Sequence, residues 1–346
     1  MAAFVVTGFA LGSVERTLSG LPNVPEITAR LDALAAAADT IDVVVLGGSR
    51  SFRGLDPAVI DAEAARAGCP LRSFNFGIAG MNRLEQARIV ETLAHVPNLR
   101  PAWLVIEALP AVAMTEANRG GARERALATP TTLVPALSDA WHHPTLAPVE
   151  RLERLAGVLS GFASSLSGSG SLARLIFGEP APGAQRFADA RGFQALDDDP
   201  SPAIRERHDA FVADRAAFAR ALAESKDTSA RPIALSTAHR AGLVDLLDRG
   251  REIAPNVALL LAPDTRPLHR AYAAGLKAAF ANEAAFGALV DLAEPSARPE
   301  LYAPGLWFDS VHLDAEGAAI ASRLLAADLC RATTPDEPAV ARLPLP

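Results

Sequence analysis

The sequence predicts an α/β protein of the three-layer α/β/α class, in which helices cover both faces of a parallel sheet of about five strands. The first observation is that short apolar runs at 43–46, 71–75 and 102–106 alternate with helical segments. The second is that the alternation resumes late in the chain, with apolar runs at 257–262 and 288–292. Strands that alternate with helices form βαβ units, in which the strands are parallel and the crossovers right-handed.

Helix signals separate the predicted strands. Apolar residues recur on one face of 26–37, as expected of an amphipathic helix. The next helix begins after Asp56, an N-cap residue that Pro57 follows at the first helical position, and it ends before Gly68. Further helices are expected at about 84–95, after the cap Ser236 to about 249, at 267–281, and after the cap Asp314 to about 329.

Residues from about 111 to 230 contain helical patches but no convincing strand. We therefore expect a helical insertion or cap on the sheet of a single domain that spans 26–332. The Ser/Gly-rich run at 164–171 is typical of a flexible segment. Near its end, the region predicts one amphipathic helix of about 20 residues, because its apolar residues recur at helical spacing: Ile204, Phe211, Phe218 and Leu222.

The two ends of the chain differ from the predicted domain. Within the leader 1–25, the apolar stretch Ala2–Leu11 is too short to span a bilayer, which takes about 20 residues, and it lacks a basic n-region. It is either the back half of an export signal or membrane anchor that starts upstream, or a first element packed on the domain. The first alternative implies a periplasmic or membrane-anchored protein and the second a cytoplasmic one. The Pro-rich tail 333–346 is expected to be disordered.

Charge and cysteine content limit the partners. The formal net charge is −7 and the Lys and Arg residues are scattered, so a nucleic-acid partner is not expected. Cys69 and Cys330 fit no metal-ligand spacing, and we expect two separate thiols rather than a disulfide.

The first candidate site residue is Ser49. It follows the apolar run Val43–Leu46 and the turn residues Gly47 and Gly48, so its hydroxyl should lie just beyond the carboxyl end of a strand. Ligands bind at that edge in open α/β sheets. The alternative is an ordinary turn residue or helix cap. Ser51 is a second candidate nucleophile, but only Ser49 directly follows the glycine turn.

A second candidate pair precedes the last predicted helix. Asp309 and His312 are three residues apart in an expected loop. A carboxylate at this spacing can accept the His Nδ1–H and leave Nε2 free to act as a general base. The alternative is a loop histidine with a local hydrogen bond. Because Ser49 and this pair are both predicted at sheet ends, we expect them to converge.

Three blocks of sequence resemble the SGNH (GDSL-type) hydrolases. Gly47–Ser49 resembles their first block, 75–80 (Asn-Phe-Gly-Ile-Ala-Gly) their second, and Asp309–His312 their last. The resemblance implies that Ser49 is the nucleophile, His312 its base and Asp309 the group that orients the base. It also implies an oxyanion hole formed by the backbone N–H groups of Ser49 and Gly80.

The chain departs from this family in two places. Gly48 stands where the family usually has Asp, and the third block, Gly-x-Asn-Asp, is replaced by 107–110 (Glu-Ala-Leu-Pro). The missing Asn is an oxyanion donor, whose loss typically costs a factor of about 10²–10³ in rate. Asn118 is the nearest amide that follows. The Gly-Gly-Ser-Arg block and the apolar leader are similar to those of divergent envelope members, relatives of proteins that O-acetylate polysaccharides.

The sequence thus leads to the hypothesis of a serine-dependent acyl ester hydrolase or O-acyltransferase. Its substrate would be a small acyl ester or an acylated carbohydrate, including cell-envelope glycan, and it would need no metal or organic cofactor. The alternative is a non-catalytic scaffold of the same fold that binds glycan or envelope partners. A phosphate-binding turn at Gly47–Gly48 is a third interpretation, but the Lys and the fuller glycine fingerprint of such turns are absent.

Three more residues are candidates for substrate contact: Arg50, Asn75 and Glu107. Arg50, with Arg53, would bind an anionic sugar or acyl carrier, and solvated surface arginines are the alternative. Glu107 would be an acid–base group, and the alternative is a buried or capping carboxylate. We interpret His142–His143 as a surface pair, and Asp291, which ends the fifth strand, as structural.

Overall fold

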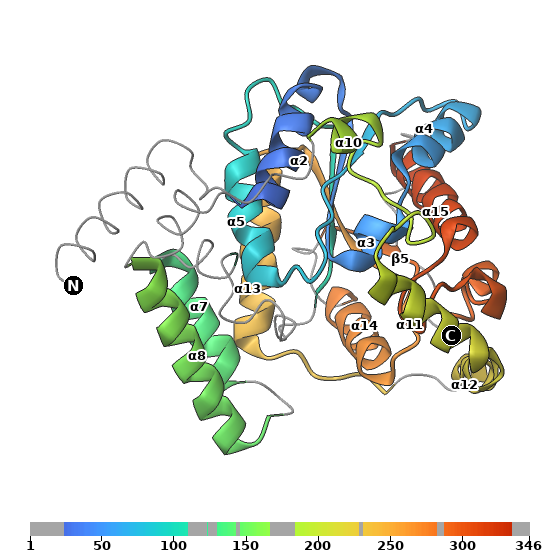
Figure 1. The fold of residues 1–346 in the computed structure, drawn as a ribbon. Coiled ribbons are helices and arrows are strands. Elements are labelled where there is room, and N and C mark those ends of the chain that lie inside the picture. Colours follow the sequence, from blue (N-terminus) through green and yellow to red (C-terminus); the bar gives the residue numbers. More distant parts are fainter. Residues whose placement is uncertain are drawn as a thin grey trace.

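Five parallel strands form one sheet in the computed structural model, which describes residues 24–109, 123, 130–142, 146–166, 184–227, 231–281 and 287–333 (Figure 1). The strand order is β2-β1-β3-β4-β5. The strands are β1 Val43–Leu46, β2 Ser73–Asn75, β3 Trp103–Glu107, β4 Asn256–Leu261 and β5 Ala288–Asp291. The predicted α/β class and the parallel sheet of about five strands are confirmed.

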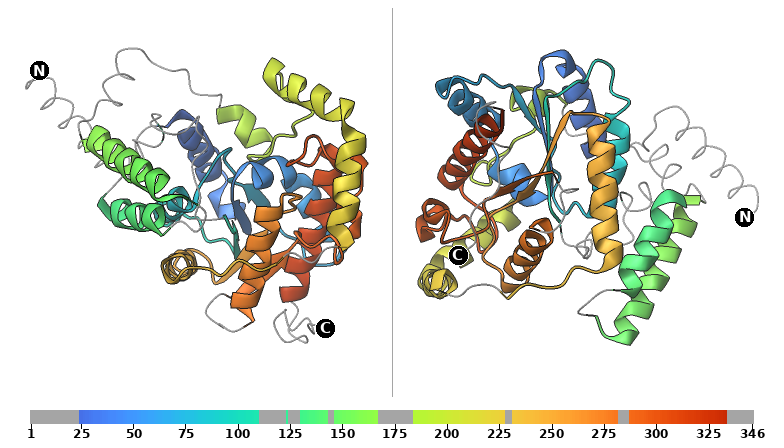
Figure 2. Two further views of the ribbon diagram at one scale, coloured as in Figure 1. Left: turned by 90° about the horizontal axis from the view of Figure 1, so that it is seen from below. Right: turned by 180° about the vertical axis from the view of Figure 1, so that it is seen from behind.

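Helices cover both faces of the sheet (Figures 1 and 2). One face packs against α2 (Pro25–Ala35), α5 (Arg83–Leu93) and α13 (Thr237–Arg251), and α14 (Pro267–Phe280) contributes Tyr272 and Leu276 to the same core. The other face packs against α4 (Pro57–Arg66) and α15 (Ala315–Thr333). The three layers of the predicted fold are therefore present.

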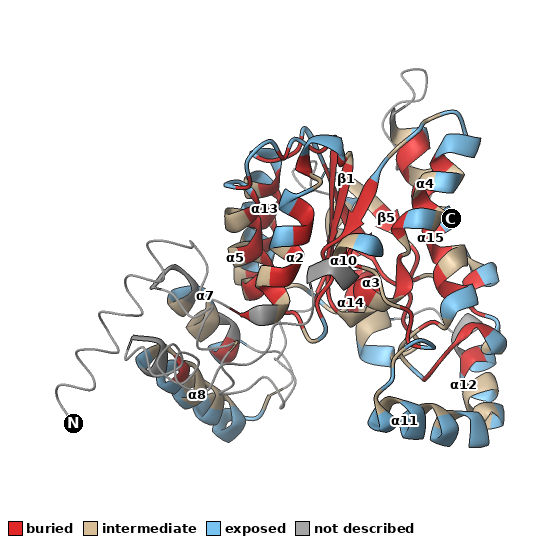
Figure 3. Cartoon of the chain, turned by 45° about the horizontal axis from the view of Figure 1, so that its top comes forward, coloured by how far each residue is buried: buried red, intermediate tan, exposed pale blue. Residues whose placement is uncertain are grey.

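The strands are apolar on both sides because both of their faces are buried, as is typical of parallel sheets. Val44 and Leu46 of β1 belong to the core under α5 and α13, whereas Val43 and Val45 belong to the core under α15. Figure 3 shows the sheet as the buried centre of the molecule. Successive side chains of a strand point to opposite faces of the sheet, so alternate residues of each strand belong to different cores.

The predicted helix starts agree with the observed caps. The side chain of Asp56 accepts a hydrogen bond from Ala58 N–H at 2.8 Å at the start of α4. Ser236 Oγ accepts from His239 N–H at 3.1 Å, and Asp314 Oδ1 accepts from Gly317 N–H at 2.8 Å. Each acceptor satisfies one of the N–H groups that the first helical turn leaves unpaired.

The chain between β3 and β4 contains only helices in its described part. They are α7 (Pro130–Trp141), α8 (Pro148–Leu166), α10 (Ala184–Asp189), α11 (Pro202–Ala213) and α12 (Arg215–Asp227). The helices α7 and α8 pack side by side and lie beyond α5 and α13, whereas α11 and α12 lie near α15 (Figures 1 and 2).

The prediction of one amphipathic helix of about 20 residues through Ile204 and Leu222 was wrong, because α11 and α12 are separate. Asp214 interrupts the helix with φ −118° and ψ 23°. The turn brings Phe218 edge-on to Phe211, at 4.9 Å between ring centroids, and against Trp307 at 5.8 Å. The apolar spacing gave no sign of the break because the same stripe continues into the second helix.

Some sequence expectations fall partly or wholly outside the described residues. Residues 1–23 of the leader and 334–346 of the tail lie outside, as do 167–171 of the Ser/Gly-rich run. The first residues of the Ser/Gly-rich run are helical, because α8 continues to Leu166. The first residue of the predicted tail, Thr333, is the last residue of α15. None of the described helices is both long enough and apolar enough to cross a membrane.

The expectation of two separate thiols was wrong, because Cys69 and Cys330 form a disulfide. Their Cα atoms lie 5.9 Å apart, within the usual range for a disulfide. The bridge joins the end of α15 to the loop after α4, two elements that are distant in sequence and packed together in the fold. Because the sequence spacing does not show that these helices are neighbours, the pairing could not be read from it.

Candidate active site

Ser49 is the first residue of a short helix, α3 (Ser49–Gly54), which begins directly after the carboxyl end of β1. This is the point where the strand order reverses between β1 and β3, the usual ligand-binding position of an open α/β sheet. A Cβ atom on Gly47 would lie 2.3 Å from Ser51 Oγ and 2.4 Å from Glu107 Oε2. Glycine is therefore required at position 47 for the tight turn that presents Ser49.

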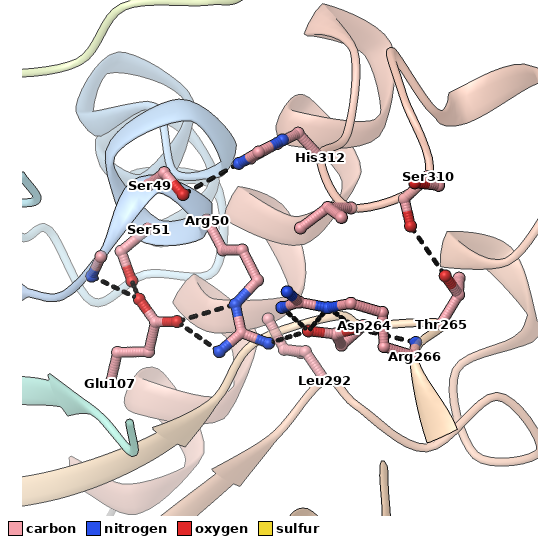
Figure 4. Close-up of polar contacts among 12 residues, drawn as sticks. Ser49, Arg50, Ser51, Glu107, Asp264, Thr265, Arg266, Leu292, Ser310 and His312 are labelled. Atoms are coloured by element: carbon pink, nitrogen blue, oxygen red, sulfur yellow. Dashed lines mark hydrogen bonds and ion pairs between the residues drawn. The ribbon is translucent and has the colours of Figure 1, made fainter. Parts of the chain in front are cut away.

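Ser49 and His312 meet across the edge of the sheet (Figure 4). The distance between Ser49 Oγ and His312 Nε2 is 2.8 Å. On the other side of the imidazole ring, Nδ1 lies 3.0 Å and 2.9 Å from the two carboxylate oxygens of Asp309. The expected convergence of these three residues is present, and Ser49 and His312 both remain partly accessible to solvent.

The loop that carries Asp309 and His312 is closed on itself. Trp307 and Leu313 form an antiparallel bridge, and Phe308 N–H donates to His312 O at 2.9 Å. Asp309 Oδ1 accepts the N–H groups of Val311 at 2.7 Å and His312 at 2.8 Å. The carboxylate therefore fixes its own loop as well as the imidazole.

The pKa of Asp309 lies below its usual value. Burial by itself would raise this pKa, but the hydrogen bond and charge of His312, the Val311 N–H and the charge of Arg207 outweigh the effect of burial. Asp309 is therefore ionised at neutral pH, which is the state that can stabilise an imidazolium.

Glu107 is fully buried and holds the turn that precedes Ser49. Its carboxylate accepts hydrogen bonds from Gly48 N–H at 2.7 Å, Ser51 Oγ at 2.7 Å and Arg50 Nε at 2.9 Å. Because all of these contacts are internal, Glu107 is the buried carboxylate of the two alternatives, and its expected substrate contact is not supported. The same contact occupies Ser51, which is buried and turned away from His312 (Figure 4).

Arg50 extends between two acidic residues beneath the site (Figure 4). It pairs with Glu107, at 2.8 Å between Nη2 and Oε1, and with Asp264, which also pairs with Arg266 at 2.6 Å. Burial would lower the pKa of Arg50, but Glu107 and Asp264 outweigh it and raise this pKa. The alternative of a solvated surface arginine was wrong, because the Arg50 side chain is only 11% exposed and neutralises buried carboxylates. A substrate contact by Arg50 stays a prediction.

Asn75 is also internal rather than a substrate contact. Its side-chain N–H₂ donates to Ser51 O and to Leu55 O, both at 2.7 Å, and its Oδ1 accepts from Gly77 N–H at 2.8 Å. The residue is fully buried. It therefore ties α3 to the loop after β2. Both side-chain N–H donors and the amide oxygen are already bonded to backbone groups in the interior.

The loop after β2 approaches the nucleophile turn. Ile78 N–H donates to Gly47 O at 2.9 Å, and Gly80 has a φ of +68°, which favours glycine. Arg123 donates to Ala79 O at 2.7 Å and pairs with Glu85 at 2.7 Å. Because the C=O and N–H of a trans peptide point in opposite directions, Arg123 also fixes the direction of the Gly80 N–H.

The remaining candidates have partners of their own or lie outside the described residues. Arg53 pairs with Asp199 at 2.7 Å, His142 Nδ1 lies 2.9 Å from Ser138 O on α7, and Asp291 pairs with Lys277 at 3.0 Å. Asn118 and His143 are not among the described residues.

Several residues at the site were missed by sequence reasoning. Asp264 follows β4 closely, and a polar residue after a strand end is the signal that singled out Ser49, so it could have been found. Arg207 lies on α11, and Arg123 in the chain between β3 and β4, without any motif around them. We found no protein-family model that matches the chain, and no curated protein is similar enough to count as a relative.

Proposed function

We propose that the protein is a serine-dependent acyl ester hydrolase or O-acyltransferase that works through an acyl-serine intermediate. The observation that carries the proposal is the continuous chain of hydrogen bonds from Ser49 Oγ through His312 to Asp309. A serine bonded to an imidazole, whose other nitrogen is bonded to a carboxylate, is the arrangement that activates a hydroxyl nucleophile.

In the proposed reaction, Ser49 Oγ attacks the ester carbonyl carbon while its proton passes to His312 Nε2. The tetrahedral intermediate then breaks the bond to the leaving alcohol, which takes that proton from His312 and departs. Water or a sugar hydroxyl next attacks the acyl-serine, again losing its proton to His312, and Ser49 recovers the proton when the acyl group leaves. The backbone N–H groups of Ser49 and Gly80 are the proposed donors to the oxyanion.

Two observations support an acylated carbohydrate of the cell envelope as the substrate class. The Gly-Gly-Ser-Arg block and the apolar leader are similar to those of envelope members of the SGNH hydrolases. Cys69 and Cys330 form a disulfide, and disulfides persist in oxidising compartments outside the cytosol. A free acyl ester remains the simplest substrate for a first assay.

Pre-steady-state hydrolysis of p-nitrophenyl acetate, with the substrate in excess over the protein, tests the proposal. We expect a burst of nitrophenol close to one equivalent, acetylation of the peptide that contains Ser49, and loss of both in Ser49→Ala. Ser310→Ala is the matched control, because Ser310 lies in the Asp309–His312 loop, exposed to solvent, and uses its carbonyl as the acceptor for Thr265. Equal bursts in Ser49→Ala and the wild type would refute the proposal.

A non-catalytic glycan- or partner-binding scaffold is the second candidate, and Glu107 favours it. The resemblance leads us to expect an amide donor after the third strand, but the strand instead ends in Glu107, whose carboxylate accepts hydrogen bonds from Gly48 N–H and Ser51 Oγ. An oxyanion hole that lacks the third donor stabilises the transition state less, by about 3–4 kcal/mol. The scaffold predicts that Ser49 forms no adduct with any acylating or phosphonylating reagent.

A further inference from the structure

A basic residue of α11 contacts the carboxylate that orients His312. Arg207 Nε lies 2.9 Å from Asp309 Oδ2, and the Arg207 side chain is 49% exposed whereas that of Asp309 is 6% exposed. The same oxygen lies 2.9 Å from His312 Nδ1. The carboxylate is thus shared between the imidazole and a guanidinium from a distant part of the chain.

The next residue of α11, His208, contacts Phe308, which directly precedes Asp309 in the loop. His208 Nδ1 lies 2.7 Å from Phe308 O, and the His208 ring stacks on the Phe308 ring at 4.3 Å between centroids. No residue of α11 is buried. The helix is held in place by these contacts and by the partly buried Phe211, which packs on the core beside Phe218.

We propose that Arg207 is a positioning residue for the Ser49–His312–Asp309 triad, so that α11 takes part in the catalytic apparatus. The inference rests on the proposed function. Asp309 Oδ1 is held by the loop N–H groups of Val311 and His312, and Arg207 is the group that holds Oδ2 from outside the loop. This contact limits the swing of the carboxylate and therefore the tilt of the imidazole that it orients.

The charge of Arg207 has a second consequence. Among the described residues, His312 from its own loop and Arg207 from α11 are the charged and titratable groups that lower the pKa of Asp309. The guanidinium therefore stabilises the ionised carboxylate that orients the imidazole. Removal of this charge should loosen the carboxylate and slow the reaction of Ser49.

The test compares Arg207→Gln, Arg207→Lys and Arg205→Gln by the rate at which a fluorophosphonate labels Ser49 between pH 5 and 9. Arg205 lies on the same exposed helix and donates to Pro200 O at 2.9 Å, so its variant controls for loss of a surface arginine. We expect Arg207→Gln to label about three- to tenfold more slowly at pH 7. Arg207→Lys, which keeps a positive charge beside Asp309, should recover part of the lost rate, and Arg205→Gln should label as fast as the wild type.

An NMR measurement separates this inference from the proposed function. In protein labelled with ¹⁵N-histidine, the signals absent from His312→Ala identify the His312 ring. We expect them to shift in Arg207→Gln and to stay in place in Arg205→Gln, whether or not Ser49 is reactive. Unchanged His312 signals and an unchanged labelling rate in Arg207→Gln would overturn the inference, whereas a wild type that is never labelled would overturn the proposed function instead.

Discussion

The carboxylate of Glu107 accepts a hydrogen bond from the backbone N–H of Gly48 at 2.7 Å, directly before the candidate nucleophile. A buried acid at the end of β3 thus fixes the turn at the end of β1. Two arginines, Arg50 and Arg266, offset the negative charges of Glu107 and Asp264. The four side chains form a network beneath Ser49 in which two positive charges offset two negative ones. The first prediction concerns this network.

Glu107→Gln should destabilise the protein. The substitution removes one charge from a buried pair and leaves Arg50 with less compensation, a change that costs about 3 kcal/mol in free energy of unfolding. Urea unfolding measures it. Glu63→Gln is the matched control, because its partner Arg66 is 67% exposed and such pairs contribute less than about 1 kcal/mol. Equal losses in the two variants would contradict the account of the network.

The disulfide should contribute to stability. Replacement of Cys69 and Cys330 together by serine should lower the free energy of unfolding by about 2–5 kcal/mol, because the bridge closes a long loop in the unfolded chain. Chemical denaturation of the oxidised and reduced wild type should show a loss of similar size. Two titratable thiols in the non-reduced, unfolded protein would instead show that no bridge forms.

Arg123→Gln should slow acylation without preventing folding. The variant loses the charged donor to Ala79 O, so the Gly80 peptide gains freedom to turn away from the oxyanion. We expect a loss of about tenfold in the rate of the acetate burst, within the range of a weakened oxyanion donor. Arg88→Gln on α5 is the control, since Arg88 pairs with Glu91 away from the loop and should leave the burst unchanged. A burst that is equally fast in both variants would argue against this role of Arg123.

Asp309→Asn should be destabilised in a pH-dependent way. Since the pKa of Asp309 is lower in the folded protein than its ordinary value, its ionised form stabilises the fold above the unfolded pKa of about 4, and this contribution is lost as the pH falls through the folded pKa. The difference in free energy of unfolding between the wild type and Asp309→Asn should therefore be largest near pH 7 and should shrink below about pH 4. The exposed Asp198→Asn is the control. A difference in free energy of unfolding that increases as the pH falls would contradict this mechanism.

The strands and the triad were accessible to sequence reasoning because their signals are local. Val43–Leu46 is an apolar run closed by two glycines, and it is β1 residue for residue. Asp309 and His312 are three residues apart before a capped helix, so their contact follows from spacing. The meeting of Ser49 with His312 needed one further assumption, that both lie at the carboxyl edge of the same parallel sheet.

The remaining features depend on neighbours that the sequence does not reveal. The sequence places Arg50 and Asn75 beside predicted strand ends, but it does not show their partners. Arg50 pairs with Asp264 after β4, and Asn75 donates to a carbonyl of α3. Arg207 lies on an exposed helix without a motif and becomes relevant only because α11 contacts the loop that carries Asp309 and His312. The disulfide required knowledge that α4 and α15 are packed together.

The dependence of Ser49 labelling on His312 tests the central claim most directly. The wild type and His312→Ala are treated with a fluorophosphonate, and the modified residue is mapped by peptide mass spectrometry. The hydrogen bond of 2.8 Å between Ser49 Oγ and His312 Nε2 predicts one adduct, on Ser49, that forms at least about 10²-fold more slowly in His312→Ala. No adduct in the folded wild type, or an adduct on Ser49 that forms equally fast without His312, would contradict it.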